Sequence, residues 1–184
     1  MSQSLYDIPV RRIDGREASL GEHKGEVLLV VNVASKCGLT PQYEGLVKLY
    51  RENAPKGLSV LGFPANEFAG QEPGTNEEIG TFCSTTYGVD FPMFEKIAVK
   101  GENIHPLYKA LIAAKPHATM KEDSQLKKAL DSRGLGSKDD TDVMWNFEKF
   151  LLDREGHVIG RFAPDITPDD PILTTAIATA LSRS

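Results

Sequence analysis

Residues 27–41 read VLLVVNVASKCGLTP, and this stretch decides the fold class. The aliphatic and β-branched run over 27–33 is typical of a central strand that is buried on both faces of a parallel sheet. After a short loop, apolar residues recur at helical spacing from about 42 to 53, which predicts an amphipathic helix. The chain therefore passes from a buried strand, through a loop that contains Cys37, into a helix.

The same kind of pattern places the remaining elements along the chain. Toward the N-terminus we expect a hairpin over 5–20 with its turn at Asp14-Gly15. Beyond residue 53 we expect, in order, a strand over 58–63, a helix over 75–88, a strand over 93–99, a helix over 104–114, strands over 143–152 and 157–162, and a last helix over 168–181. This order predicts a thioredoxin-like α/β fold with an N-terminal β-hairpin and helical or loop insertions, in one domain over residues 1–184.

Composition excludes several classes of function. The 184 residues carry a net charge of −5 and no basic run, so nucleic acids and anionic membrane surfaces are poor candidate partners. The most apolar run, 27–31, is too short to cross a bilayer. Residues 1–15 have neither the positive start nor the apolar stretch of a secretory signal. We therefore expect a cytoplasmic protein, with a periplasmic mature form left open.

The chain has two cysteines, Cys37 and Cys83, and its four histidines show no metal-ligand spacing, so we expect no metal and no cofactor. Cys37 lies between a buried strand and a helix, where unpaired N–H groups and the helix dipole would favour the reactive thiolate. By position alone, a catalytic Cys37 and an inertly packed one are about equally expected. Thr40 stands where thioredoxin-like enzymes carry a second cysteine, which excludes a local dithiol motif.

Three motifs resemble those of the glutathione peroxidase family and occur in the family's order. The first is NVASKCGLT over 32–40, the second combines LGFPANEF over 61–68 with QEP over 71–73, and the third is WNFEKF over 145–150. The resemblance extends over nearly the whole chain. It points to the bacterial, cysteine-containing thioredoxin/glutathione peroxidase branch of the family.

The resemblance implies a catalytic set of four residues, Cys37, Gln71, Trp145 and Asn146. The amides of Gln71 and Asn146 and the indole of Trp145 are neutral N–H donors, which can stabilise a thiolate and then the charge on a departing peroxide oxygen. The implied reaction is attack of the Cys37 thiolate on hydrogen peroxide or an organic hydroperoxide, which gives a sulfenic acid and water or an alcohol. Without the motifs around them, the three donors would more simply be core, loop and turn residues.

In the same resemblance, Cys83 matches the resolving cysteine of relatives that use thioredoxin. It would attack the Cys37 sulfenic acid and form a disulfide, which thioredoxin, with glutathione as the alternative, would then reduce. Since a disulfide needs the two Cα atoms within about 7 Å, we expect the helix over 76–86 to unwind locally on oxidation. A buried helical cysteine that faces the core is the alternative for Cys83.

Three departures from the family's pattern bear on the site and its surroundings. Ala65 stands where many relatives carry a further cysteine, and Glu67 stands where they usually carry glutamine. The loop that helps tetrameric members associate is missing between 86 and 93, so we expect a monomer.

Segment 115–142 is charged and lacks apolar periodicity, which predicts a surface excursion with one short helix near 124–130. It either borders the site or is a solvated insertion.

Two other functions stay open at this point. A peroxide sensor that passes its disulfide to a partner protein needs the same two cysteines, and the sequence does not separate it from an enzyme. A small-molecule binding or transport-accessory protein on a thioredoxin-like fold would not need the four-residue set.

Overall fold

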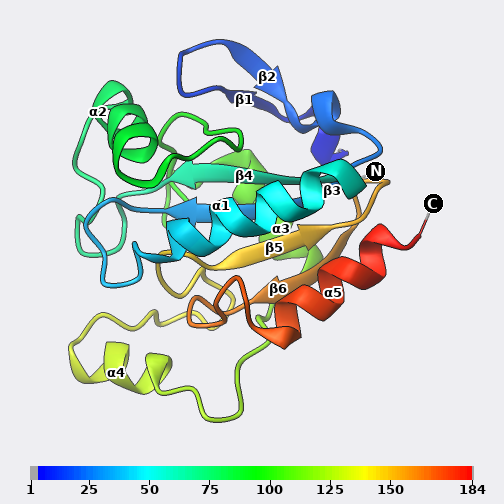
Figure 1. The fold of residues 1–184 in the computed structure, drawn as a ribbon. Helices are drawn as coiled ribbons and strands as arrows, with labels where there is room; N and C mark the ends of the chain where they lie inside the picture. Colours follow the sequence, from blue (N-terminus) through cyan, green and yellow to red (C-terminus); the bar gives the residue numbers. More distant parts are fainter. Residues whose placement is uncertain (1–3, 184) are drawn as a thin grey trace.

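The structure, a computed structural model, describes residues 4–183; residues 1–3 and 184 of the predicted domain lie outside the described part. Its centre is a four-stranded sheet in the order β4-β3-β5-β6 (Figure 1). These strands are β3 (Val27–Val33), β4 (Leu58–Pro64), β5 (Lys149–Leu152) and β6 (Val158–Phe162). β3 pairs in parallel with β4, whereas β5 is antiparallel to both β3 and β6. Every residue of β3 and β4 is buried, as their apolar sequences predict.

Helices cover both faces of this sheet. α1 (Gln42–Asn53) and α5 (Pro171–Leu181) lie in front of the sheet in Figure 1, and α3 (Pro106–Ala114) lies behind it. α2 (Asn76–Phe82) and α4 (Leu126–Ser132) are shorter and lie outside these layers. The helices therefore form where the sequence predicts them, with small differences at their starts, where caps and proline decide the first residue. The helix predicted over 75–88 also differs at its end, because α2 stops at Phe82 and the chain continues as a π-helical turn, Cys83–Tyr87.

The predicted N-terminal hairpin forms, but its strands are short. β1 (Pro9–Arg11) pairs antiparallel with β2 (Glu17–Ser19). Gly15 has a φ of +91°, which glycine adopts without strain, and it makes the predicted turn. One-turn 3₁₀ helices flank the hairpin, and a third follows α1; they are Leu5–Asp7, Leu20–His23 and Ala54–Lys56.

The strand predicted over 93–99 is wrong. Met93 and Phe94 form only single bridges to other parts of the chain. Beyond them, backbone N–H groups of 95–99 bond four separate acceptors, namely Arg11 O, Asn76 Oδ1, Pro64 O and the Glu67 carboxylate. The apolar residues of this segment are therefore buried against several neighbours in turn, rather than paired along one strand.

The strand predicted over 143–152 is wrong in its first half, because β5 begins only at Lys149. Residues 144–148 form a turn instead, in which Phe147 has a φ of +69°. This left-handed conformation is strained for a bulky residue and persists only where neighbouring contacts enforce it. The turn carries Trp145 and Asn146, so the break in the strand lies at a predicted site.

Polar and charged side chains are buried in and around this turn. The exposed fraction is at most 1 % for each of five residues, Asn32, Asn146, Glu148, Lys149 and Arg161. An unpaired buried polar group costs about 1–3 kcal/mol, so their hydrogen-bond partners determine whether the turn is stable. Their contacts are described with the site.

Candidate active site

Cys37 lies in the loop that joins β3 to α1. Thr40 closes this loop with both its backbone and its side chain. Its N–H donates to Cys37 O at 3.0 Å, and its Oγ1 accepts from Cys37 N at 2.9 Å and donates to Ala34 O at 2.8 Å. Thr40 stands at the position where a dithiol enzyme would carry its second thiol. Here its role is to fix the backbone of Cys37.

The Cys37 thiol is nearly enclosed, with 8 % of the residue exposed. Leu39 N donates to its Sγ at 3.3 Å. The expected helix N-terminus is not the source of this donor, because α1 begins only at Gln42. Within residues 4–183, no hydrogen bond joins Sγ to the side chain of Gln71, Trp145 or Asn146.

Gln71 and Asn146 are brought together directly. Asn146 Nδ2 donates to Gln71 Oε1 at 2.9 Å, and Gln71 O accepts from Lys36 N at 3.0 Å. Two residues with positive φ, Ala69 at +57° and Gly70 at +62°, form the tight turn just before Gln71. Gln71 therefore connects the loop of Cys37 to the turn of Asn146.

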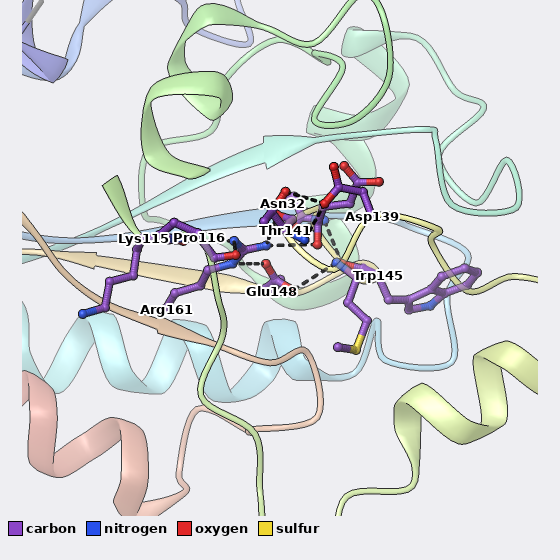
Figure 2. Close-up of polar contacts among 10 residues, drawn as sticks. Asn32, Lys115, Pro116, Asp139, Thr141, Trp145, Glu148 and Arg161 are labelled. Atoms are coloured by element: carbon purple, nitrogen blue, oxygen red, sulfur yellow. Dashed lines mark hydrogen bonds and ion pairs between the residues drawn. The ribbon is translucent and has the colours of Figure 1, made fainter. Parts of the chain in front are cut away.

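Trp145 is held by the end of β3 and by an aromatic neighbour. Asn32 Nδ2 donates to Trp145 O at 3.1 Å (Figure 2). Asn32 O accepts from Phe147 N at 2.7 Å. The indole ring packs against Phe68 with ring centroids 5.5 Å apart. The sequence analysis predicted no role for Asn32, although a single amide within an aliphatic strand indicates a buried hydrogen bond.

Cys83 is buried beside the hydroxyl of Tyr43. It is buried at the junction where α2 passes into a π-helical turn, Cys83–Tyr87, and both cysteines are free thiols. The ring centroid of Tyr43 lies 5.4 Å from that of Phe147 and 6.5 Å from that of Phe82. Tyr43 thus stands between the turn of Asn146 and the Cys83 segment.

Burial raises the pKa of the Cys83 thiol to about 11, with the nearby Glu72 carboxylate adding to the effect and the Tyr43 hydroxyl opposing it. At neutral pH Cys83 is therefore a protonated thiol, which is the unreactive form. A cavity of about 320 Å³ between the loop of Cys37 and α2 is lined by Ser35, Lys36, Glu72 and Phe82, among others. In the reduced protein Cys83 is therefore buried and protonated, and both properties slow its reaction.

Glu72 is a buried acid that the sequence did not single out as a site residue. Only 1 % of it is exposed, and its Oε2 has no hydrogen-bond partner among the described residues. Burial raises the pKa of its carboxyl, while Ser35, Lys96 and Lys36 lower it in part. Glu67, the other acid of this region, accepts a hydrogen bond from Val99 N at 2.8 Å and so anchors the segment after Met93.

Within residues 4–183, no group of three or more His, Cys, Asp or Glu side chains is arranged to hold a metal ion. No helix there combines the length and apolar character needed to cross a bilayer.

Residues 5–112, more than half of the chain, match the family model for glutathione peroxidase. The chain belongs to the glutathione peroxidase family. As a member it is a thiol-dependent oxidoreductase that reduces peroxides. It is 51% identical to the thioredoxin/glutathione peroxidase BtuE of Escherichia coli over 183 residues, which cover 100% of both chains. It is 44% identical to the hydroperoxy fatty acid reductase gpx1 of Synechocystis sp., with 92% of each chain covered.

Solved structures confirm the predicted thioredoxin-like fold. The crystal structure of Trgpx in apo form has a TM-score of 0.71 and 34% identity, with 99% of this chain and 98% of that one covered. T. cruzi GPX1 has a TM-score of 0.70 and 33% identity, with 97% of each covered. A thiol:disulfide interchange protein from Chlorobium tepidum TLS scores 0.59 at 15% identity, with 99% of each covered, a likeness of fold alone.

The buried position of Lys149 predicts that the stability of this glutathione peroxidase depends on pH. Its Nζ is buried and donates to Phe147 O at 2.6 Å and to Pro164 O at 3.2 Å. Burial lowers the pKa of Lys149 from 10.5 to about 7, against the opposing carboxylates of Glu148 and Asp165. Between these two values the unfolded chain keeps a proton that the folded chain has lost, so stability rises with pH there.

We therefore expect the free energy of unfolding, relative to that of Lys149→Met, to rise from about pH 7 to pH 10. The slope is at most about 1.4 kcal/mol per pH unit. Urea unfolding of both proteins at several pH values measures it, and the other titrating groups cancel in the difference. Parallel curves for the two proteins would show that Lys149 keeps its proton when buried.

Proposed function

We propose that Cys37 is the peroxidatic nucleophile, that Gln71, Trp145 and Asn146 assist it, and that Cys83 resolves its oxidised form for reduction by thioredoxin. The hydrogen bond of 2.9 Å between Asn146 and Gln71 carries the proposal. It joins two residues 75 positions apart, beside the loop of Cys37. Structural requirements of the fold alone give no reason for two amides to meet there.

The free groups of this amide pair suit a hydroperoxide. With Gln71 Oε1 occupied by Asn146, the N–H groups of Gln71 remain for a second partner. Asn146 Oδ1 is buried and has no partner among the described residues. A hydroperoxide both accepts and donates hydrogen bonds, so it can use a free donor and a free acceptor at one place.

The first step forms one bond and breaks another. The Cys37 thiolate attacks the outer oxygen of ROOH, the S–O bond forms, and the O–O bond breaks. The departing RO⁻ takes a proton and leaves as ROH, or as water when the substrate is hydrogen peroxide. Neutral N–H donors near the departing oxygen stabilise its charge in the transition state.

The second step requires the Cys83 segment to move. The start of α2 is anchored, because Lys96 Nζ donates to Glu72 O and Gly74 O at 2.8 and 2.6 Å. The end of α2 passes into the π-helical turn, a geometry that often marks functional sites, and the helix itself has seven residues. Unwinding from Cys83 onward would expose its thiol, allow it to ionise and bring it to the Cys37 sulfenic acid, with loss of water.

We infer thioredoxin as the reductant because a disulfide between Cys37 and Cys83 is the kind of bond that a dithiol protein opens by exchange. The name of the Escherichia coli relative includes both thioredoxin and glutathione, and glutathione is the alternative. The cytoplasm supplies either reductant, and we place the protein there as a monomer of one domain.

A coupled assay tests the reductant. We expect NADPH consumption with hydroperoxide, thioredoxin and thioredoxin reductase to exceed that with glutathione and glutathione reductase at least about tenfold in kcat/KM. Many turnovers per protein molecule would also separate an enzyme from a peroxide sensor, which is oxidised about once per signal. Equal or faster turnover with glutathione would contradict the thioredoxin assignment.

Asn146→Ala tests the amide pair. Loss of the Nδ2 donor frees Gln71 Oε1 to turn toward the thiol, where an acceptor repels the developing charge. We expect the second-order rate constant for oxidation of Cys37 by hydroperoxide to fall about a hundredfold, the effect of losing one well-placed donor. Asn53→Ala, which removes a hydrogen bond to Leu49 O in α1, is the matched control and should react at the wild-type rate. An unchanged rate in Asn146→Ala would remove Asn146 from the site.

A further inference from the structure

Arg161 of β6 is buried and uses every N–H of its guanidinium group. Nε donates to the Glu148 carboxylate at 2.7 Å, and the two terminal nitrogens donate to four backbone carbonyls at 2.9 to 3.0 Å. An arginine has five such N–H donors, so none is left over. The side chains of Arg161 and Glu148 are each 1% exposed. Figure 2 shows the pair with the backbone groups that Arg161 binds.

The four carbonyls belong to the two ends of one segment. Two are those of Lys115 and Pro116, where the charged 115–142 segment leaves the core. The other two are those of Thr141 and Asp142, where it returns. One guanidinium group therefore closes the whole segment at its base, just before the turn of Trp145.

Glu148 links this clamp to the turn itself. Its Oε2 accepts from Arg161, and its Oε1 accepts from Met144 N at 3.0 Å. The turn is thus fixed at Met144 by Glu148, while Asn32 and Lys149 bind its later backbone groups. Together these contacts explain how the strained φ of Phe147 persists.

We propose that Arg161 and Glu148 are positioning residues, which hold the 144–148 turn so that Trp145 and Asn146 meet the peroxide at Cys37. The inference rests on the proposed roles of Trp145 and Asn146. Figure 2 shows the indole of Trp145 pointing away from the Arg161–Glu148 pair, so the pair acts through the backbone and not by contact with substrate. A buried ion pair is poor evidence for stability, since apolar residues often serve as well, and a positioning role gives it a separate reason to exist.

The only tryptophan of the chain provides a direct readout of this role. Trp145 fluorescence and its quenching by acrylamide report whether the turn keeps its place. In Arg161→Lys, an ammonium with three donors cannot serve four carbonyls and a carboxylate. In Glu148→Gln, an acceptor for Met144 remains, but the amide no longer matches the charge of Arg161.

The test is stopped-flow oxidation of Cys37 by hydroperoxide, measured on Arg161→Lys and Glu148→Gln well below the unfolding temperature of each. We expect at least about a tenfold fall in the rate constant per folded molecule, because a small misplacement of an assisting group costs that much. We also expect stronger quenching of Trp145 by acrylamide. The rate constant for alkylation of Cys37 by iodoacetamide should change by less than about threefold, because this reaction does not depend on groups that are positioned to bind a peroxide.

Arg154→Lys is the matched control. Arg154 also donates to four backbone carbonyls, those of Gly25, Lys56, Leu181 and Arg183, but it follows β5 at the end of that strand opposite to Lys149. Because Arg154 is partly exposed, we expect this variant to lose less stability than Arg161→Lys, and to keep the wild-type rate and Trp145 quenching.

The outcomes separate the inference from the function on which it rests. Wild-type rates and quenching in both Arg161→Lys and Glu148→Gln, with a slow Asn146→Ala, would overturn the positioning role and leave the catalytic set intact. A wild-type rate in Asn146→Ala would instead overturn the catalytic set. Glu148→Gln keeps all four carbonyl contacts of Arg161, so the inference is judged on it alone if Arg161→Lys does not fold.

Discussion

Replacement of Cys37 by serine is expected to abolish peroxide reduction. A serine hydroxyl is not ionised near neutral pH and is a far weaker nucleophile toward a peroxide oxygen than a thiolate. We expect kcat/KM for hydroperoxide, in the thioredoxin-coupled assay, to fall by at least about a thousandfold, as when other enzymes lose their nucleophile. The fold should survive, because serine is nearly isosteric and its oxygen can still accept from Leu39 N.

Circular dichroism and the unfolding temperature of Cys37→Ser serve as controls for the fold. Full activity in a folded Cys37→Ser protein would contradict the assignment of the nucleophile. It would also revive the hypothesis of a binding or transport-accessory protein on this fold.

Replacement of Cys83 by serine is expected to separate the two halves of the cycle. The first equivalent of hydroperoxide should oxidise Cys37 at the wild-type rate, because Cys83 is a buried, protonated thiol that makes no hydrogen bond to Cys37 among residues 4–183. Turnover with thioredoxin should then fall at least about a hundredfold, since no disulfide forms for thioredoxin to open. Stopped-flow oxidation and the coupled assay measure the two halves on the same protein.

A retained thioredoxin-dependent rate in Cys83→Ser would show that the two-cysteine cycle is wrong, while peroxide reduction by Cys37 would stand. The reduced wild-type protein offers a related check. Because burial raises the pKa of Cys83 to about 11, its alkylation should be slow until α2 unwinds.

The sheet and the long helices could be predicted because their residues follow one periodicity from end to end. β3 and β4 are apolar at almost every position, and α1 repeats its apolar residues on one face. The segment over 93–99 and the turn before β5 could not, because their apolar residues are buried without strand pairing. Periodicity reports burial, and it does not report which backbone groups pair.

The proposed catalytic set was predicted from motifs and not from geometry, and the structure shows the contacts that these residues make. Asn146 and Gln71 meet as a pair, whereas Cys37 lies in a loop ahead of α1 and takes its donor from Leu39. The contacts of Arg161 and Lys149 could not be predicted from the sequence, for a physical reason. Arg161 and Lys149 look like ordinary surface charges in the sequence, and only the folded chain shows that backbone carbonyls from distant segments bind them.

The most direct test of Cys37 as the nucleophile is to trap its oxidised form. Cys83→Ser is treated with one equivalent of hydroperoxide in the presence of a dimedone reagent, which reacts with sulfenic acids, and the labelled residue is identified by peptide mass spectrometry. The proposed role of Cys37 predicts that its thiol is lost as fast as the peroxide is consumed, and that one adduct per molecule then accumulates on Cys37. Peroxide consumption that leaves Cys37 as an unmodified thiol would contradict it.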